Sequence, residues 1–399
     1  MTNNKQSFAI GLFSGIIIIV AIIFGYDFFI GYKAAVDPLD ISPSSIIAKN
    51  KVSEIEKLIN QRFWHEFENA DLTDGMYAGL VDGLGDKYSA YYTKEEFEKM
   101  IESLNGHYQG IGVILMMAKD STDVVVGHIY ENSPAAQAGV AVGDIIIAID
   151  EIELTDETLE AVAEKIRGSK DDIVTLTLIR EGEEEPQEIA VEKGDVEMVT
   201  VMSEMLEDDI GYISIMQFTD TTAGQFEEAY QELKEAGMKG LLVDVRNNPG
   251  GSLPGVCDTL QVFMPAGLLV YSEDRQGDQL NFESQGLNPI EIPLVVLINE
   301  NSASAAEIFA AAVQDHQVGT LVGQTTFGKG VVQSIFNLTD GSAVKLTTSA
   351  YFTPNGIDIN GKGISPDVEV ENIVPEEVDG SEELSDTQLD EAIELLKNM

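Results

Sequence analysis

The stretch from Pro293 to Gln314 decides the fold, and it reads PLVVLINENSASAAEIFAAAVQ. Its first part, Pro293–Ile298, is an unbroken apolar run, which is typical of a strand buried on both faces. A short polar turn follows, and small and apolar residues then favour a helix from Ser304 to Gln314. A buried strand that leads through a turn into a helix predicts a layered α/β fold.

The same pattern repeats on the N-terminal side of this stretch. Gly211–Ile215 and Gly240–Val245 are short apolar segments that predict strands, and Thr222–Ala236 predicts a helix that Gly237 ends. Alternating strands and helices indicate helices packed on a mainly parallel sheet. We therefore expect an α/β core over residues 194–374.

The start of the predicted helix at Ser304 has two interpretations. A nucleophile is well placed there, because the strand holds the backbone and a helix N-terminus favours developing negative charge. However, Ser304-x-x-Glu307 is also the pattern of a capping box, in which serine and glutamate satisfy backbone N–H groups without any chemistry. Ser302 is a second candidate for the cap, so the local sequence leaves both interpretations open.

A lysine downstream favours the catalytic interpretation. The run Thr325–Gln333 reads TTFGKGVVQ and places Lys329 between glycines in an apolar stretch. An exposed lysine has a pKa of about 10.4 and is a poor base at neutral pH, but burial lowers that pKa. Lys329 could then remove the proton from a serine hydroxyl. A solvated lysine in a hairpin turn is the alternative.

These two runs resemble the active-site motifs of the C-terminal processing, or tail-specific, protease family. The usual serine motif of that family is Ser-Ala-Ser-Ala-Ser-Glu-Ile, and this chain differs from it at Ala306. The usual lysine motif is Phe/Tyr-Gly-Lys-Gly, with a glutamine a few residues later. The resemblance implies that Ser304 is the nucleophile, Lys329 its general base and Gln333 the residue that orients the lysine.

The run VDVRNNPGG, from Val243 to Gly251, resembles a further signature of the same family. A predicted strand enters a glycine-rich turn whose backbone N–H groups can face a substrate. The resemblance implies that the N–H groups of Gly251 and Ala305 form an oxyanion hole, in which each donor commonly contributes ~3–4 kcal/mol to acyl transfer. A tight turn without a ligand is the alternative.

Residues 104–193 resemble a PDZ domain. The resemblance rests on GIGV at 110–113 and on SPAAQAGV at 133–140, followed by VGDII at 142–146. Successive backbone N–H groups in the glycine loop can hold a terminal carboxylate, while the peptide adds as a strand to the sheet edge. A loop that serves only as a turn in a rigid spacer is the alternative. The expected carboxylate-binding residues are Gly110, Ile111, Gly112 and Val113.

Arg167 lies in the run KIRG, at the end of a helix predicted over 158–166. The protease family often has a basic residue between the PDZ domain and the active site, so the resemblance implies a regulatory role for Arg167. A plain surface arginine is the alternative.

The N-terminus carries a long apolar segment. From Phe8 to Tyr26, about 19 residues, Ser14 is the only clearly polar side chain, and that length crosses a hydrocarbon core of ~30 Å. A cleaved signal peptide is the alternative, although its apolar run is usually about 7–15 residues long. Lys5 precedes the segment and directs the rest of the chain outward. We expect an uncleaved single-pass anchor in the cell membrane, with the protease domain extracytoplasmic.

The predicted fold class is α/β plus PDZ, with the β-rich PDZ domain inserted before the α/β protease core. For this core the resemblance implies a ClpP/crotonase-like sheet with packed helices. The predicted domains, in chain order, are a cytoplasmic stub and transmembrane helix at 1–33, a linker at 34–43, a helical region at 44–103, the PDZ domain at 104–193, the protease core at 194–374 and an acidic C-terminal tail or helix at 375–399.

Composition argues against several classes of function. The chain has 69 acidic and 23 basic residues, and a net charge of -46 repels nucleic acid. The sequence contains neither a cysteine cluster nor a His-Glu-x-x-His motif, so it does not indicate a metal site. The 4 histidines form no motif of a trypsin-like triad. The single cysteine, Cys257, lies in an apolar stretch and is predicted to be a buried small side chain.

We expect a serine endopeptidase that binds the apolar C-termini of polypeptide substrates through its PDZ domain and cleaves by a Ser-Lys acyl-enzyme mechanism, without a cofactor. Because a fold does not determine a function, a non-catalytic PDZ scaffold or ligand-binding protein on the same fold is the alternative. Leu389, Ile393 and Leu396 recur at helical spacing, so the tail could dock, fray or join a homodimer. A regulatory partner protein is also compatible with this organisation.

Overall fold

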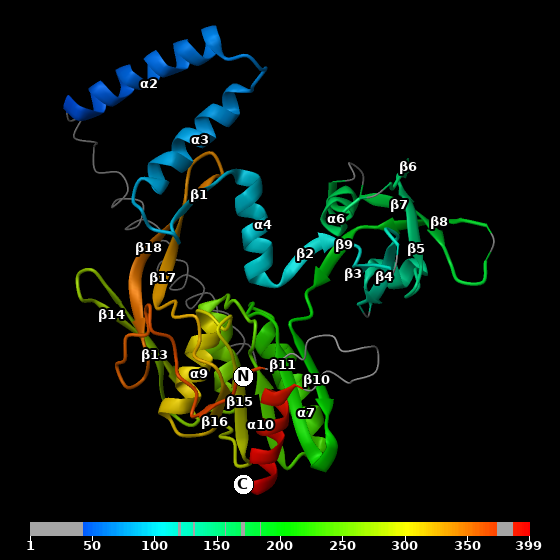
Figure 1. Ribbon diagram of the computed structural model, residues 1–399, viewed down its shortest axis with the longest axis vertical. Helices are drawn as coiled ribbons and strands as arrows, with labels where there is room; N and C mark the ends of the chain where they lie inside the picture. Colours follow the sequence, from blue (N-terminus) through cyan, green and yellow to red (C-terminus); the bar gives the residue numbers. More distant parts are fainter. Residues whose placement is uncertain are drawn as a thin grey trace, which may run out of the picture. The chain divides into compact units, whose positions relative to one another are not determined.

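The computed structural model describes residues 43–118, 121–130, 132–155, 157–168, 172–183, 185–372 and 386–399 (Figure 1). The predicted anchor at 1–33 lies outside the described residues, and so do residues 34–42 of the predicted linker. Among the described residues, no helix combines the length and apolar composition needed to cross a membrane. The chain divides into two compact units, one up to Leu72 and the other from Thr73 onward.

The region predicted to be helical at 44–103 is helical for most of its length. α2 (Pro43–Arg62) lies in the first unit, α3 (Asn69–Asp82) begins where that unit ends, and α4 (Lys94–Asn105) lies in the second. Thr93 and Glu96 close a capping box at the start of α4. This capping box and the apolar periodicity of α4 explain why that segment is helical, as predicted.

The helical pattern is interrupted between α3 and α4, and this interruption includes a strand that was not predicted. β1 (Ala90–Tyr92) is a short strand that pairs antiparallel with β18 (Ala343–Phe352). Pairing with β18 satisfies backbone groups of β1, and tyrosines suit a strand that is half buried.

The predicted PDZ region contains an antiparallel sheet of order β3-β4-β5-β7-β8, with β6 paired to β5. Alternation within β7 shows why it forms: Val174, Leu176 and Leu178 are buried, and the residues between them are half exposed. The elements of this region are β2 (His107–Gly110), β3 (Val113–Met117), β4 (Val124–Ile129), α5 (Pro134–Ala138), β5 (Ile145–Ile149), β6 (Ile152–Glu153), α6 (Leu159–Gly168), β7 (Ile173–Ile179), β8 (Gln187–Glu192) and β9 (Gly194–Glu197).

The backbone is not extended throughout the apolar run at 110–115. β2 ends at Gly110 and β3 begins at Val113, because Gly112 has φ 76, a left-handed conformation that breaks an extended backbone. The interruption separates β2, which pairs with β9, from β3, which pairs with β4.

The predicted parallel sheet is confirmed in the C-terminal part of the chain. Strands β11, β12, β15, β16 and β19 are parallel, and β10 adds to one edge in the antiparallel direction. The elements are β10 (Val201–Met205), the short 3-10 helix η1 (Glu207–Asp209), β11 (Ile210–Ile215), α7 (Thr222–Glu235), β12 (Gly240–Asp244), α8 (Leu253–Gln261), β15 (Leu294–Ile298), α9 (Ala305–Asp315), β16 (Thr320–Gly323), β19 (Val368–Glu369) and α10 (Thr387–Asn398).

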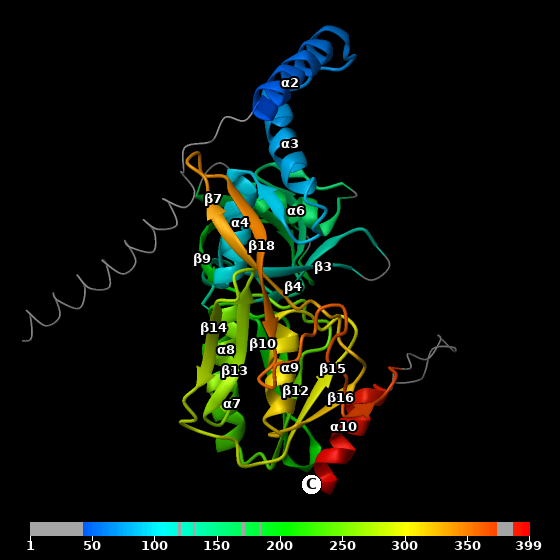
Figure 2. The ribbon, with the colours of Figure 1, turned by 90° about the vertical axis from the view of Figure 1, so that its left-hand side faces the viewer.

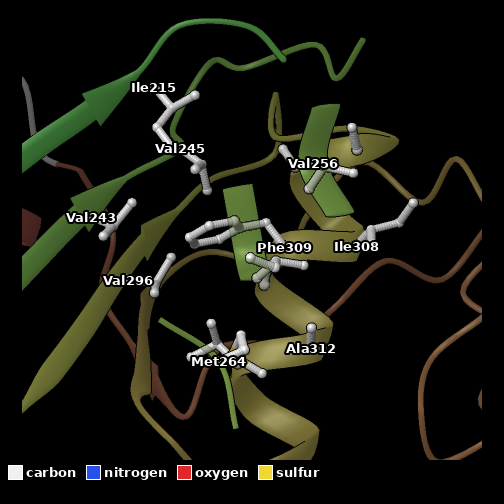
Figure 3. Packing of buried hydrophobic residues seen from close by; sticks show 14 of the residues in the cluster. Ile215, Val243, Val245, Val256, Met264, Val296, Ile308, Phe309 and Ala312 are labelled. Atoms are coloured by element: carbon white, nitrogen blue, oxygen red, sulfur yellow. The ribbon is translucent and has the colours of Figure 1, made fainter. Parts of the chain in front are cut away.

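Both faces of this sheet are covered. Figure 3 shows Phe309 of α9 directed toward Val243 and Val296, and these side chains belong to the main apolar cluster. On the opposite face, Leu242 and Leu396 belong to a second cluster, to which α10 contributes (Figure 2). The C-terminal helix therefore docks on the sheet, and each buried leucine contributes about 1.5–3 kcal/mol.

β1 belongs to a second sheet, which was not predicted from the sequence. Its order is β1-β18-β13-β14, and β17 also pairs with β18 (Figure 1). Its remaining strands are β13 (Gly267–Asp274), β14 (Gln279–Ser284) and β17 (Val331–Asn337).

Candidate active site

The residues predicted for catalysis meet in one cavity. A cavity of about 550 Å³ is lined by Ser304, Lys329, Gln333, Gly251 and Ala305. They come from the turns after β12, β15 and β16 and from the start of β17, so residues far apart in the chain are brought together at one end of the parallel sheet. This is the edge at which α/β folds place their functional groups.

Ser304 stands in an unusual backbone conformation at the start of α9. Its φ is 54 and its ψ is -112, a combination that costs a non-glycine residue about 1–3 kcal/mol and is typical of functional sites. The side chain of Glu307 accepts the N–H of Ser304 at 2.9 Å, which is the glutamate half of a capping box. Ser304 therefore occupies the position of a helix cap and also faces the cavity.

Ser302 does not cap the helix. Its hydroxyl donates to the carbonyl of Val245 at 2.8 Å and accepts the N–H of Asn299 at 3.0 Å. Ser302 is fully buried, so these bonds tie the turn before Ser304 to the end of β12.

Glu307 holds both halves of the predicted dyad. Its carboxylate accepts the N–H of Ser304 and, at 2.8 Å, the N–H of Lys329. It also accepts the N–H of Gly328 at 2.7 Å and the hydroxyl of Thr326 at 2.6 Å. Glu307 is fully buried, so these donors satisfy its charge and fix the two loops relative to each other. The capping pattern pointed to Glu307 but gave no sign of the contacts with 326–329.

The surroundings of Lys329 suit a general base. Burial lowers the pKa of Lys329 below its ordinary value, and the positive charges of Lys345 and Lys87 lower it further, against the opposing effect of Glu307. The Nζ atom of Lys329 lies 4.8 Å from the centre of the Tyr88 ring. The sequence analysis anticipated the burial, and it missed Tyr88 and the neighbouring lysines.

Tyr351 was also missed by the sequence analysis. It lies on β18, is almost completely buried, and lines the same cavity. Its hydroxyl donates to the carbonyl of Ser304 at 3.1 Å and to the carbonyl of Lys329. Burial, together with the charge of Glu307, raises the pKa of Tyr351 well above its ordinary value, so the hydroxyl stays a donor.

Gln333 lies in the cavity, as expected from its position after Lys329. Its amide nitrogen donates to the carbonyl of Val331 at 3.3 Å and to the hydroxyl of Thr347 at 3.4 Å. These bonds hold its side chain against β18, and its role in orienting Lys329 stays a prediction.

Gly251, a predicted oxyanion donor, pairs with Phe218 across the glycine turn. Phe218 forms a parallel bridge with it by donating to the carbonyl of Gly250 (2.9 Å) and accepting from Ser252 N–H (2.7 Å). In such a bridge the N–H of the central residue points away from the partner strand. A Cβ on Gly251 would lie 1.9 Å from the carbonyl oxygen of Phe218, so only glycine fits. Ala305 is the first residue of α9, where a backbone N–H has no partner within the helix.

Asn248 joins the glycine turn to the turn that carries Ser304. Its side chain donates to the carbonyl of Ile215 and accepts the N–H of Gly250, both at 2.8 Å. Its own carbonyl accepts the N–H of Ala303 at 2.9 Å. Asn248 is fully buried, so it fixes the distance between the two predicted oxyanion donors.

The residues predicted for peptide binding line a separate cavity of about 490 Å³. Gly110, Ile111, Gly112 and Val113 all contribute to it, and so does Arg167 at the end of α6. Its wall runs along β3, which is an edge strand of its sheet, and along the apolar side of α6. The apolar lining residues from these two elements are Val113, Leu115, Leu159, Ala163 and Ile166, and Glu160 and Arg167 of α6 add charged side chains.

Two further predictions concern metals and the cysteine. Cys257 is buried, and burial raises the pKa of its thiol to about 12, so it behaves as a small apolar side chain. In the part of the chain that the structure describes, no group of three or more metal-ligating side chains is found.

Two family models match the chain. The model described as peptidase family S41 matches residues 209–370, and a PDZ domain model matches residues 125–180. The first match covers both sheets around the cavity of Ser304 except β1 and β10. The second covers most of the antiparallel sheet beside the cavity of Gly112.

Several curated proteins are similar over most of the chain. A carboxy-terminal-processing protease of Bartonella bacilliformis is 36% identical over 319 residues, which cover 78% of this chain and 73% of that protein. A carboxyl-terminal-processing protease of Synechocystis is 34% identical over 298 residues, covering 73% and 69%. Among solved structures, the photosystem II D1 C-terminal processing protease is 27% identical, with a TM-score of 0.46 and coverage of 79% of this chain and 86% of that chain.

Proposed function

This chain belongs to the carboxy-terminal-processing serine proteases of peptidase family S41, and we propose that Ser304 and Lys329 carry its chemistry as nucleophile and general base. The observation that carries the proposal is the shared cavity, in which both residues lie with Gly251 and Ala305. The chain is thus a peptidase that combines an α/β core with a PDZ domain.

The proposed reaction starts with proton transfer from the hydroxyl of Ser304 to the neutral amine of Lys329. The serine oxygen then forms a bond to the scissile carbonyl carbon, and the electron pair of the carbonyl moves to its oxygen. The N–H groups of Gly251 and Ala305 stabilise that oxyanion. When the C–N bond breaks, the leaving amine takes the proton from Lys329. Water then attacks the acyl ester with Lys329 again as base, which releases the acid and restores Ser304.

Substrate selection is proposed to use the second cavity. A peptide with an apolar C-terminus would add as a strand to the free edge of β3, with its side chains between β3 and α6. Its carboxylate would meet the N–H groups of the loop Gly110–Val113. Arg167 lies beside this cavity and is proposed to have a regulatory role.

The remaining proposals concern the whole chain. We keep the ClpP/crotonase-like description of the core, the predicted domain boundaries and an N-terminal anchor with the protease domain extracytoplasmic. The apolar segment at 8–26 supports the anchor, and its length supports an uncleaved span. A homodimer and a regulatory partner protein also stay proposals.

The test compares the full-length chain with its Ser304→Ala and Lys329→Ala variants. Each is incubated with an unstructured protein that ends in apolar residues, and the fragments are identified by mass spectrometry. Both variants are expected to lose all cleavage. Cleavage that survives in either one would overturn the dyad. If the wild type itself binds the substrate through the β3 cavity but never cleaves it, a non-catalytic scaffold is the better description.

A further inference from the structure

The segment Gly85–Tyr92, here called the strap, is tied to the strand that flanks the catalytic cavity. Its last part is β1, paired with β18 from Ala90 opposite Lys345 onward. Before β1, the hydroxyl of Ser89 donates to the carboxylate of Asp86 at 2.5 Å and accepts the N–H of Thr347 at 3.0 Å. Ser89 is buried. The strap is thus held on both sides of residue 88.

This attachment places an aromatic ring against the proposed base. The Nζ atom of Lys329 lies 4.8 Å from the centre of the Tyr88 ring, and that of Lys87 lies 4.7 Å from the same ring. Distances below ~6 Å put an ammonium within the attractive field of a ring face. The proposed proton transfer does not use Tyr88, although its ring lies beside Nζ of Lys329, the atom that receives the proton.

We propose that Tyr88 is a positioning residue for Lys329 and that its ring stabilises the ammonium group formed when Lys329 takes the proton of Ser304. The proposal rests on the proposed function, because it requires Lys329 to be the base. It assigns a role to the strap, which is remote in sequence from both catalytic loops.

The ring of Tyr88 acts on the charge that Lys329 gains during the reaction. A neutral amine gains little from the quadrupole of a ring, whereas an ammonium gains substantially. An interaction that strengthens as the reaction proceeds lowers the barrier, whereas one present equally at the start does not. The ring of Tyr88 therefore favours the proton-transfer step itself, and it also limits the positions that the Lys329 side chain can take.

Other charged and titratable groups face Lys329 from each element packed against it. Lys345 comes from β18 and Lys87 from the strap, and both disfavour the ammonium; Glu307 from α9 favours it. Tyr351 contacts the Lys329 carbonyl from β18. Burial and the two neighbouring lysines lower the pKa of Lys329, and the ring of Tyr88 offsets the repulsion of the lysines once the proton has moved.

The test distinguishes the electrostatic effect of the Tyr88 ring on Lys329 from the contribution of the side chain to packing. Single-turnover acylation of a peptide substrate is followed from acidic to alkaline pH for the full-length wild type, Tyr88→Phe and Tyr88→Leu. Tyr88→Leu keeps an apolar side chain and loses the ring face. It is expected to lower the plateau rate roughly three- to thirtyfold and to move the acidic limb to lower pH. Tyr88→Phe keeps the ring and is expected to retain both properties.

Tyr77→Leu is the matched control. Tyr77 packs on Tyr91 of the strap, with ring centres 5.4 Å apart, whereas the ring over Nζ of Lys329 is that of Tyr88. An equal effect of Tyr77→Leu would show that only the docking of the strap matters, and it would overturn the proposal. The proposal is also wrong if Tyr88→Leu keeps the plateau rate and the acidic limb of the wild type. It is equally wrong if the plateau rate falls while the acidic limb stays in place.

The same experiment distinguishes this proposal from the dyad. Lys329→Ala is run in parallel: if it retains cleavage, Lys329 is not the base and both ideas fall. If Lys329→Ala is inactive while Tyr88→Leu equals the wild type, only the role of Tyr88 is wrong. Should Tyr88→Leu unfold, as judged by its melting temperature, Tyr88→Met replaces it with the same expected shift.

Discussion

The carboxylate of Glu307 accepts the backbone N–H of Lys329 at 2.8 Å, on the same oxygen that accepts the N–H of Ser304. A single buried side chain thereby sets the separation of the two loops that carry the proposed nucleophile and base. Such a group matters for geometry rather than for proton transfer, and its loss should affect rate and stability together.

The first prediction concerns Glu307→Gln. Its amide nitrogen would face backbone N–H groups on one side of the site, so donors would meet a donor in a buried position. We expect a loss of about 3 kcal/mol in the free energy of unfolding and a fall in rate of at least about tenfold. Urea unfolding and peptide cleavage measure these. Glu300→Gln, on an exposed residue of the turn before Ser304, is the control and should change neither.

The second prediction is that Lys329→Met is inactive and more stable. The folded state lowers the pKa of Lys329, so it binds the proton less tightly than the unfolded chain does. In the unfolded chain the pKa of this lysine is about 10.4. At a pH below its pKa in the folded state, Lys329 lowers the free energy of unfolding by the full amount, and this destabilisation disappears as the pH rises through about 10.4. Because Lys329 is only half buried, we expect a gain of about 1 kcal/mol at neutral pH.

Urea unfolding at neutral pH and again near the unfolded pKa checks this second prediction. Lys239→Met is the matched control, because Lys239 is exposed and its pairing with Asp209 raises its pKa. It should give no gain. A Lys329→Met protein that is less stable than the wild type at neutral pH would contradict the sign.

Much of the parallel sheet was predictable because its strands are continuous apolar runs. Val243 and Val296 lie in such runs, and both predicted strands are present. Gly251 and Ser304 follow two of these predicted strands, whereas Lys329 follows β16, which was not predicted, and Gln333 lies on β17 of the second sheet. The strands of Val243 and Val296 could therefore be predicted from the local sequence alone.

The second sheet was not predictable from local sequence. β17 and β18 mix apolar and polar residues and are half buried for most of their length, so they lack a clear apolar run. Tyr351 and Lys345 on β18 reach the site only through this long-range pairing, and Tyr88 reaches it through the pairing of β1 with β18. Pairing between distant segments leaves little trace in local periodicity.

The third prediction concerns Gly251→Ala. The new Cβ would lie 1.9 Å from the carbonyl oxygen of Phe218, and φ at this position is 133, which disfavours any side chain. The turn must shift, and its N–H would leave the proposed oxyanion position, so we expect a rate loss of about a hundredfold or more. Gly277→Ala is the control: it also has positive φ (87) but has nothing within 4 Å. Its rate should equal that of the wild type.

The fourth prediction tests the β3 cavity. Ala163→Asp places a charge among the apolar side chains of this cavity. The new carboxylate repels the incoming peptide carboxylate, and it lies one helical turn from Arg167, whose charge it would partly neutralise. We therefore expect affinity for a peptide with an apolar C-terminus to fall at least about tenfold. Fluorescence anisotropy with free-acid and C-terminally amidated peptides measures it. Equal binding of the two peptides by the wild type would refute carboxylate recognition.

The last prediction gives the pH dependence of the proposed base. Only neutral Lys329 can remove a proton, so kcat/KM should rise with pH through its pKa and then level off. The positive charge of Lys345 is one cause of the lowered pKa of Lys329. Lys345→Met removes that charge, raises the pKa and moves the acidic limb to higher pH, with about a tenfold loss on the limb per pH unit moved.

Lys239→Met changes the net charge of the chain by the same amount and should leave the limb in place. A Lys345→Met limb that stays put or moves to lower pH would show that Lys329 does not titrate as the base. The expected direction is opposite to that of Tyr88→Leu, because the lysine disfavours the ammonium and the ring favours it. A general loss of folding cannot produce opposite shifts, so the pair of variants tests the electrostatics of the site itself.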